Sequence, residues 1–118
     1  MPQVIVRYRP SAVSSSAIHG IRDDVRMLVA EAASTEGVKL DLSDVDWVPQ
    51  AYEPAAMAPN LAIEIRTIGF PERKAKMNRS TILDLKKRIM ELPDFPSSCR
   101  RLELLIWVQF TDPDGVHV

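Results

Sequence analysis

The chain has 118 residues, of which 46% are hydrophobic and 26% charged, and its formal net charge is -1. That size and composition predict one globular domain with its own core. A net charge near zero argues against nucleic acid or an anionic membrane as the partner. The single cysteine, Cys99, excludes an internal disulfide, and no Cys/His cluster has metal-ligand spacing, so we expect no metal site. Neither a long apolar run nor a signal peptide is evident, which favours the cytoplasm.

The first half of the sequence has the pattern of a strand, a helix and a second strand. β-Branched and aromatic residues over 3–8 predict a strand that ends before Pro10. Apolar residues then recur at helical spacing and predict a helix over about 16–34, with a serine cap at 14–16 and a stop at Gly37. A second strand is expected at 45–48, closed by Pro49.

The second half repeats this order after a connection over 50–60. Alternating residues over 61–68 predict a half-buried strand. A helix is expected over about 74–92, where Pro93 stops it. A strand over 102–110 follows, and its nearly continuous apolar run indicates that both of its faces are covered. The tail from 111 to 118 is expected to form a turn and a short extension.

The two halves also resemble each other in sequence. Residues 4–7 (VIVR) match residues 63–66 (IEIR) at an offset of 59, and Trp47 matches Trp107 at an offset of 60. These matches predict a single domain over 1–118 with pseudo-repeats at about 2–52 and 60–112. The expected fold is α/β (α+β), with duplicated β-α-β units forming a four-stranded sheet that has two helices on one face.

Such a sheet has a second face without helices. The apolar last strand indicates that this face is covered, and another copy of the chain is the simplest cover, so we expect a homo-oligomer. A ferredoxin-like β-α-β-β-α-β sandwich has the same order of elements. The two folds differ in strand order, which the sequence pattern leaves open.

Met1-Pro2 directly before a strand, followed by doubled β-α-β units, resembles the tautomerase superfamily, in the long class that includes macrophage migration inhibitory factor. The other local similarities are Lys39 ten residues before Pro49, Ile68-Gly69 followed by residues 78–80 (NRS), and Trp107 and Gln109, which stand where the family carries a tyrosine and an asparagine. The tail over 114–117 (DGVH) is similar to that of an uncharacterised bacterial family of tautomerase-like proteins. The resemblance implies a trimer whose three sheets face a central barrel.

The resemblance also implies a chemistry. In that family the terminal proline is a general base, so Pro2 would be catalytic once Met1 is removed. The reaction would be keto–enol proton transfer on a small enolisable carbonyl acid, without a metal or any other cofactor. An amine must be neutral to accept a proton, and free α-amino groups have pKa values of about 7.7–8.0. The substrate-binding residues that the resemblance implies are Lys39, Ile68, Arg73, Trp107 and Gln109. Cations among them would bind a carboxylate, and Trp107 and Gln109 would face Pro2 of another subunit.

Each of these residues also has a purely structural interpretation. Lys39 has the pattern of a solvated loop lysine, Ile68 and Trp107 of packing residues, and Gln109 of a residue at a sheet edge. Two alternatives to an enzyme therefore stay open. One is a non-catalytic homo-oligomeric domain that binds a small molecule, and the other is a ferredoxin-like interaction module.

Overall fold

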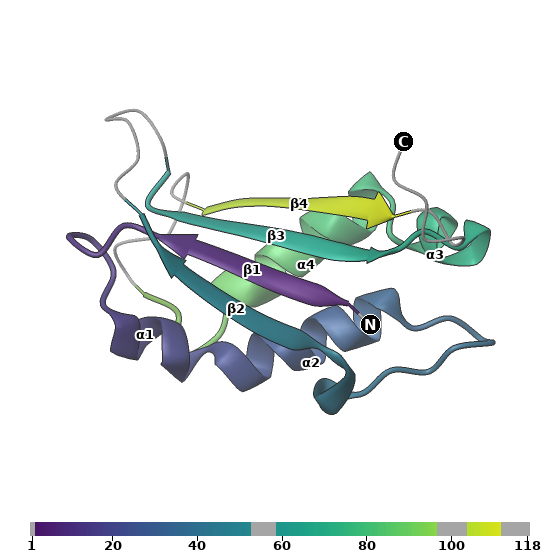
Figure 1. Cartoon of the computed structure of the whole chain (residues 1–118), viewed down its shortest axis with the longest axis horizontal. Helices are drawn as coiled ribbons and strands as arrows, with labels where there is room; N and C mark the ends of the chain where they lie inside the picture. The colour runs from purple at the N-terminus through teal and green to yellow at the C-terminus, as the bar shows by residue number, and fades with distance from the viewer. Residues whose placement is uncertain (1, 53–58, 97–103, 112–118) are drawn as a thin grey trace.

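The computed structural model describes residues 2–52, 59–96 and 104–111, which are the coloured parts of the chain in Figure 1. Met1, Cys99, the start of the last predicted strand at 102–103 and the tail from 112 onward lie outside the described residues. The elements in chain order are β1 (Gln3–Tyr8), α1 (Ser15–Gly20), α2 (Arg22–Ala33), a 3-10 turn (Leu42–Asp44), β2 (Asp46–Ala51), β3 (Leu61–Ile68), α3 (Pro71–Lys76), α4 (Arg79–Met90) and β4 (Leu104–Thr111). No helix of this described part is long and apolar enough to cross a membrane.

The four strands form one mixed sheet in the order β2-β1-β3-β4, and the helices lie on one face of it (Figure 1). β1 pairs with β2 and β3 pairs with β4, in both cases in parallel, while β1 and β3 pair antiparallel in the centre. In a ferredoxin-like sandwich the strands of each β-α-β unit are split by another strand. The observed order therefore confirms the predicted four-stranded arrangement and excludes the ferredoxin-like alternative.

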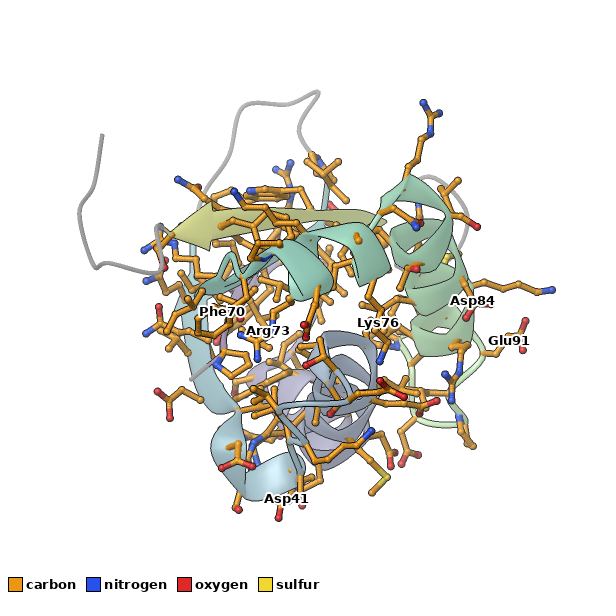
Figure 2. All side chains as sticks on the ribbon, turned by 90° about the vertical axis from the view of Figure 1, so that its right-hand side faces the viewer. Asp41, Phe70, Arg73, Lys76, Asp84 and Glu91 are labelled. Atoms are coloured by element: carbon orange, nitrogen blue, oxygen red, sulfur yellow. The ribbon has the colours of Figure 1, made fainter. Side chains whose placement is uncertain are left out.

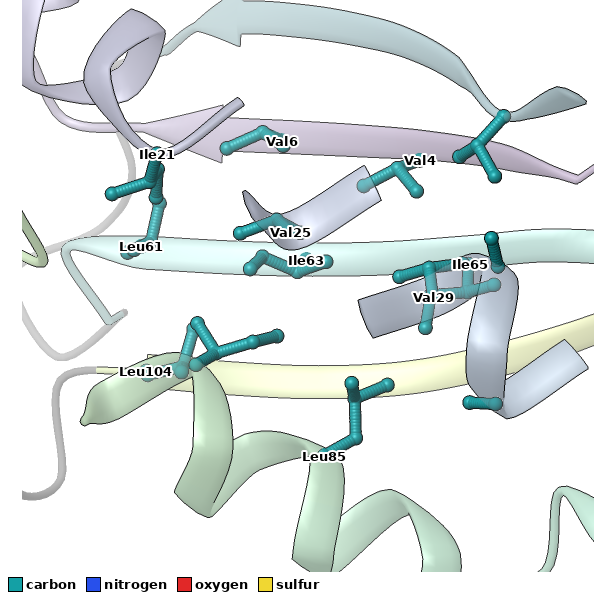
Figure 3. Packing of buried hydrophobic residues seen from close by; sticks show 14 of the residues in the cluster. Val4, Val6, Ile21, Val25, Val29, Leu61, Ile63, Ile65, Leu85 and Leu104 are labelled. Carbon is teal, nitrogen blue, oxygen red and sulfur yellow. The ribbon is translucent and has the colours of Figure 1, made fainter. Parts of the chain in front are cut away.

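The strand register assigns each side chain to one face of the sheet. Val4 and Val6 lie in register with Ile65 and Ile63, and all four belong to the core beneath the helices. Figure 3 shows Val25 and Val29 of α2 next to Ile63 and Ile65, and Leu85 of α4 beside β4. The alternate residues of the four strands face the other way, onto the face without helices, which we call the open face.

The two tryptophans do not occupy equivalent positions. Trp47 lies opposite Val4 and packs against the core, whereas Trp107 lies opposite Glu64 on the open face. The offset of 59 that matches Val4 with Ile63 matches Trp47 with Ile106, which lies opposite Ile63. An offset of 60 shifts this match by one residue, and a shift of one residue exchanges the two faces of a strand. The Trp47–Trp107 correspondence is therefore wrong as a structural equivalence. In both parallel pairs, however, the strands meet at the same spacing, with Gln3 opposite Asp46 and Leu61 opposite Leu104.

Both predicted helices are broken in two. The first is interrupted at Ile21, whose backbone has φ -101° and ψ 0°, and it ends at Ala33, within one residue of the predicted end. The second starts earlier than predicted, at Pro71, and is interrupted at Met77, where ψ is 55°. Asn78 then caps α4 by accepting a hydrogen bond from the Thr81 amide.

The second strand was also predicted too short. Pro49 does not close it, because β2 continues through this residue to Ala51. β2 is an edge strand, so the missing N–H of Pro49 removes no ladder hydrogen bond on its outer side. Ser14, in contrast, caps α1 as the serine run predicts, with its hydroxyl accepting a hydrogen bond from the Ala17 amide.

Candidate functional site

Pro2 lies at the end of the sheet where β1 begins and β3 finishes. The residue is buried, and its carbonyl oxygen accepts a hydrogen bond of 3.0 Å from the amide of Asp46. Gln3 lies opposite Arg66 in the antiparallel register, so one further step places Pro2 opposite Thr67. Thr67 in turn lies opposite Phe110 of β4. Pro2 therefore heads a row of side chains that crosses the sheet close to the start of α3.

Arg73 of α3 packs against this row. Its side chain is almost wholly buried, with 3% of the residue exposed, and burial lowers the pKa of its guanidinium. Nε donates to the carbonyl oxygen of Ala33 at 2.9 Å, and Nη1 donates to Thr67 Oγ1 at 2.9 Å and to the carbonyl of Ile68 at 3.2 Å. Figure 2 looks onto this end of the molecule and shows Arg73 between Phe70 and Lys76.

Arg73 has no carboxylate partner among the described residues. Its three hydrogen bonds use Nε and Nη1, and Nη2 forms none within the described part of the chain. A buried cation without an anion is costly, and buried charges in proteins are normally paired. The arrangement therefore suits an incoming carboxylate.

The turn after β3 places Arg73 through two local features. Gly69 allows close contact with the last strand, because a Cβ at this position would lie 2.9 Å from Phe110 Cβ and 3.3 Å from the Thr111 carbonyl oxygen. Its amide donates to that carbonyl at 2.8 Å. Pro71 then occupies the first turn of α3, where a missing N–H is tolerated. The helix thus begins directly over the end of the sheet.

Two aromatic rings accompany the cations at the start of α3. The Arg73 guanidinium carbon lies 5.6 Å from the centroid of the Phe70 ring, and Lys74 Nζ lies 6.0 Å from the centroid of the Phe110 ring. Sequence reasoning missed Thr67, Phe70, Lys74 and Phe110. The sequence carries a signal only for Thr67, a polar residue at a position where the alternation of β3 predicts burial.

The two substrate-binding residues predicted in the last strand, Trp107 and Gln109, do not lie beside Pro2 and Arg73 of the same chain. Trp107 and Gln109 are on the open face, opposite Glu64 and Arg66, and Gln109 is exposed. Ile68 ends β3 and is half-buried, and its carbonyl binds Arg73. Within one chain the structure therefore brings together Pro2, Arg73 and the backbone of Ile68, and places Trp107 and Gln109 on the other face of the sheet.

Glu64 is a buried carboxylate on the open face, where the alternating pattern of β3 predicted an exposed side chain. Only 4% of the residue is exposed, and its carboxylate binds Arg7 Nη1 at 2.9 Å and Arg66 Nε. Burial by itself raises the pKa of Glu64, but the hydrogen bonds and charges of Arg66 and Arg7 outweigh it and hold that pKa below its usual value.

Lys39 lies apart from Pro2 and Arg73. It is exposed, in the segment that links α2 to the 3-10 turn, and it lines a hollow whose described lining includes Lys76, Ser34 and Leu40 but neither Pro2 nor Arg73. The predicted lysine therefore lies in a hollow whose described lining does not include the predicted base.

No protein-family model and no curated protein matches this sequence. Comparison of the structure finds FG41 malonate semialdehyde decarboxylase, at 13% identity and TM-score 0.62 over 98% of this chain and 87% of that chain. It also finds a fused 4-OT, at 7% identity and TM-score 0.59 over 98% and 91% of the two chains. A macrophage migration inhibitory factor-like protein from Entamoeba histolytica matches at 6% identity and TM-score 0.55 over 99% and 94%.

The chain has the tautomerase fold. The predicted resemblance is thereby confirmed for the fold alone, because sequence identities of 6–13% show a shared architecture but not a shared activity. Within the described residues of this tautomerase fold, no group of three His, Cys, Asp or Glu side chains could hold a metal ion. The groups at the Pro2 end of the sheet are the buried guanidinium of Arg73, the Thr67 hydroxyl that it binds, and the Phe70 and Phe110 rings.

Proposed function

We propose that this chain is a cofactor-independent tautomerase-type enzyme that acts on a small enolisable carbonyl acid. The observation that carries the proposal is the buried guanidinium of Arg73, which has no carboxylate partner in the described part and binds Thr67, the residue in register with Pro2. Solved structures with this fold include a malonate semialdehyde decarboxylase and a member of the cis-3-chloroacrylic acid dehalogenase family. Both are named for small acids, which supports a carboxylate substrate here.

In this proposal Pro2 is the base. Removal of Met1 makes its nitrogen a secondary amine, and burial and a neighbouring cation both disfavour the charged form of an amine. For an enol, the neutral nitrogen takes the proton of the hydroxyl as the C–O bond becomes a carbonyl. The resulting ammonium gives a proton to the other carbon of the former C=C bond, so the net proton count is unchanged. Arg73 Nη2 binds the substrate carboxylate and holds the reacting atoms beside the amine.

The proposal includes an assembly, because Trp107 and Gln109 lie on the open face. A homo-oligomer packed through that face, with a trimer as the favoured form, would bring these residues toward Pro2 of another copy. The apolar side chains on this face support burial between copies, since Leu105 is 50% exposed and the half-buried Val48 and Trp107 lie in one row across the sheet. A cytoplasmic location remains a prediction from the sequence.

The first test needs a free terminus. Protein with a C-terminal tag is checked by intact mass for loss of Met1 and is then assayed for ketonisation of phenylpyruvate enol. We expect Pro2→Ala to lower kcat/KM by about 100-fold, the lower range for loss of a general base. A form with an uncleaved N-terminal extension retains Pro2 but has no amine there, so its kcat/KM should fall at least as far as that of Pro2→Ala. Equal rates for the three proteins would end the proposal.

Arg73→Met and Arg73→Lys test the carboxylate site in the same assay. Loss of the substrate contact should raise KM, and lysine should restore part of the affinity because it keeps the charge. If Pro2→Ala and wild type both lack activity while the protein still binds phenylpyruvate, the alternative of a non-catalytic binding domain holds.

A further inference from the structure

A hollow on the outer side of α2 forms a second candidate site. It lies between α2 and residues 34–42, and its volume of about 580 Å³ falls within the range of small-molecule sites. Met27, Ala30, Leu40 and Leu42 supply apolar surface, and Met27 is 57% exposed. Since neither Pro2 nor Arg73 is part of the described lining, this hollow is separate from the site of the proposed reaction.

The wall of the hollow is held in place by hydrogen bonds. Ser34 Oγ donates to the Ala30 carbonyl at 2.7 Å and accepts from the Leu40 amide at 2.9 Å. The Thr35 amide donates to the Val38 carbonyl at 2.8 Å, and the Val38 amide donates back to Thr35 Oγ1 at 3.2 Å. The segment opposite α2 is therefore preformed and requires little ordering when a ligand binds.

The acidic groups of the lining already have partners. Both carboxylate oxygens of Glu31 bind the guanidinium of Arg88 at 3.2 Å, which lowers the pKa of Glu31. Asp41 Oδ1 accepts hydrogen bonds from the amide and hydroxyl of Ser43, which lower the pKa of Asp41. In Figure 2, Asp41 and Lys76 lie on opposite sides of the end of α2.

The basic groups of the lining, in contrast, have no carboxylate partners among the described residues. Lys76 Nζ donates to the carbonyls of Glu31 and Ser34 at the end of α2 and has no carboxylate partner among the described residues. Lys39 forms neither a hydrogen bond nor an ion pair with any described residue. The hollow thus combines apolar walls with one ammonium group that is free within the described part of the chain.

We propose that this hollow binds a small organic anion with an apolar body, of the class of short-chain fatty carboxylates. Lys39 pairs with the carboxylate, and Met27, Leu40 and Leu42 contact the hydrocarbon chain. The site does not depend on the proposed enzymatic activity, because it shares no described lining residue with Pro2 or Arg73.

The test is an NMR titration of 15N-labelled protein with sodium hexanoate at pH 7. We expect the amide signals of Ser34, Leu40 and Lys39 to shift with saturation. Lys39→Met should weaken binding by about two- to fivefold, the upper part of the range for an exposed ion pair. Lys87→Met is the matched control, since Lys87 is an exposed lysine on α4 outside this lining, and it should bind hexanoate as wild type does.

Two further measurements distinguish binding in this hollow from binding at the Pro2 end of the sheet. Hexylammonium carries the same chain with the opposite charge and should leave these amides unshifted. Shifts confined to Thr67 and Phe70, and lost in Arg73→Met, would place hexanoate at the Pro2 end and overturn the second site. Equal affinities of Lys39→Met and Lys87→Met, or no saturable shift at Ser34 and Leu40, would overturn it as well.

Discussion

Thr67 Oγ1 accepts a hydrogen bond of 2.9 Å from Nη1 of Arg73, and both residues are buried. Thr67→Val keeps the shape of the side chain but leaves the Arg73 donor without this acceptor. A buried hydrogen bond to a charged group that loses one partner costs about 1–3 kcal/mol. We therefore expect urea unfolding to show a loss of that size. Thr111→Val is the control, because among the described residues the Thr111 hydroxyl has one acceptor, the Thr67 carbonyl at the long distance of 3.5 Å. An equal loss in both variants would contradict the role of the Arg73 bond.

Gly69 and Gly20 offer a matched pair of glycine-to-alanine substitutions. A Cβ at Gly69 would meet Lys74 Cε at 2.5 Å, which a flexible side chain can relieve, but also Phe110 Cβ at 2.9 Å and a backbone oxygen of Thr111 at 3.3 Å. Gly69→Ala should therefore destabilise the fold by about 1–3 kcal/mol. Gly20 lies in α1 with nothing within 4 Å of an added Cβ, so Gly20→Ala should be neutral or stabilising by up to about 1 kcal/mol. Thermal unfolding measures both, and a Gly69→Ala protein as stable as Gly20→Ala would contradict the close approach.

The central strand β3 was predictable from sequence because side-chain alternation fixes both its extent and its faces. The alternation over Leu61–Ile68 gave the central strand with its observed bounds, and it placed Ile63 and Ile65 on the core side. The pattern could not separate a half-buried strand from a fully buried one. Burial of Glu64 depends on Arg7 of the neighbouring strand, a contact across 57 residues that no local pattern contains.

The candidate site was predictable only in part, because local sequence patterns do not contain contacts between residues that are far apart in the chain. Arg73 follows a glycine-containing turn and opens a helix, a local feature, and the structure places it against the residue in register with Pro2. Lys39 was assigned by its distance in sequence from Pro49, and that spacing does not determine on which side of α2 the connecting segment lies. The breaks at Ile21 and Met77 were missed because apolar spacing continues across them, while backbone geometry does not.

Glu64 makes the stability of this fold dependent on pH. Its pKa in the folded chain lies below the ordinary value of 4.5, so it contributes stability that is fully present above about pH 4.5 and is lost as the pH falls through the lower folded value. Glu64→Gln should lower the free energy of unfolding at pH 7 by about 1–2 kcal/mol, and the difference from wild type should shrink in acid. Glu31→Gln removes an exposed pair with Arg88 and should change stability at pH 7 by less than about 1 kcal/mol. A Glu64→Gln difference that stays constant from pH 7 to acid would contradict the cause given for the lowered pKa.

The open face provides the test of assembly. Leu105 lies on this face beside Ala62 and is 50% exposed in the single chain, while Leu83 of α4 is 55% exposed on the side of the helices. An aspartate at a surface buried between copies would be a desolvated charge without a partner. Burying an unpaired charge in an interface weakens association by several kcal/mol. We therefore expect sedimentation to give a particle of three times 13.3 kDa for wild type and for Leu83→Asp, and the 13.3 kDa monomer for Leu105→Asp. Circular dichroism of the dissociated variant controls for unfolding. A monomeric wild type, or equal masses for the two aspartate variants, would show that the open face is not the surface through which copies of the chain associate.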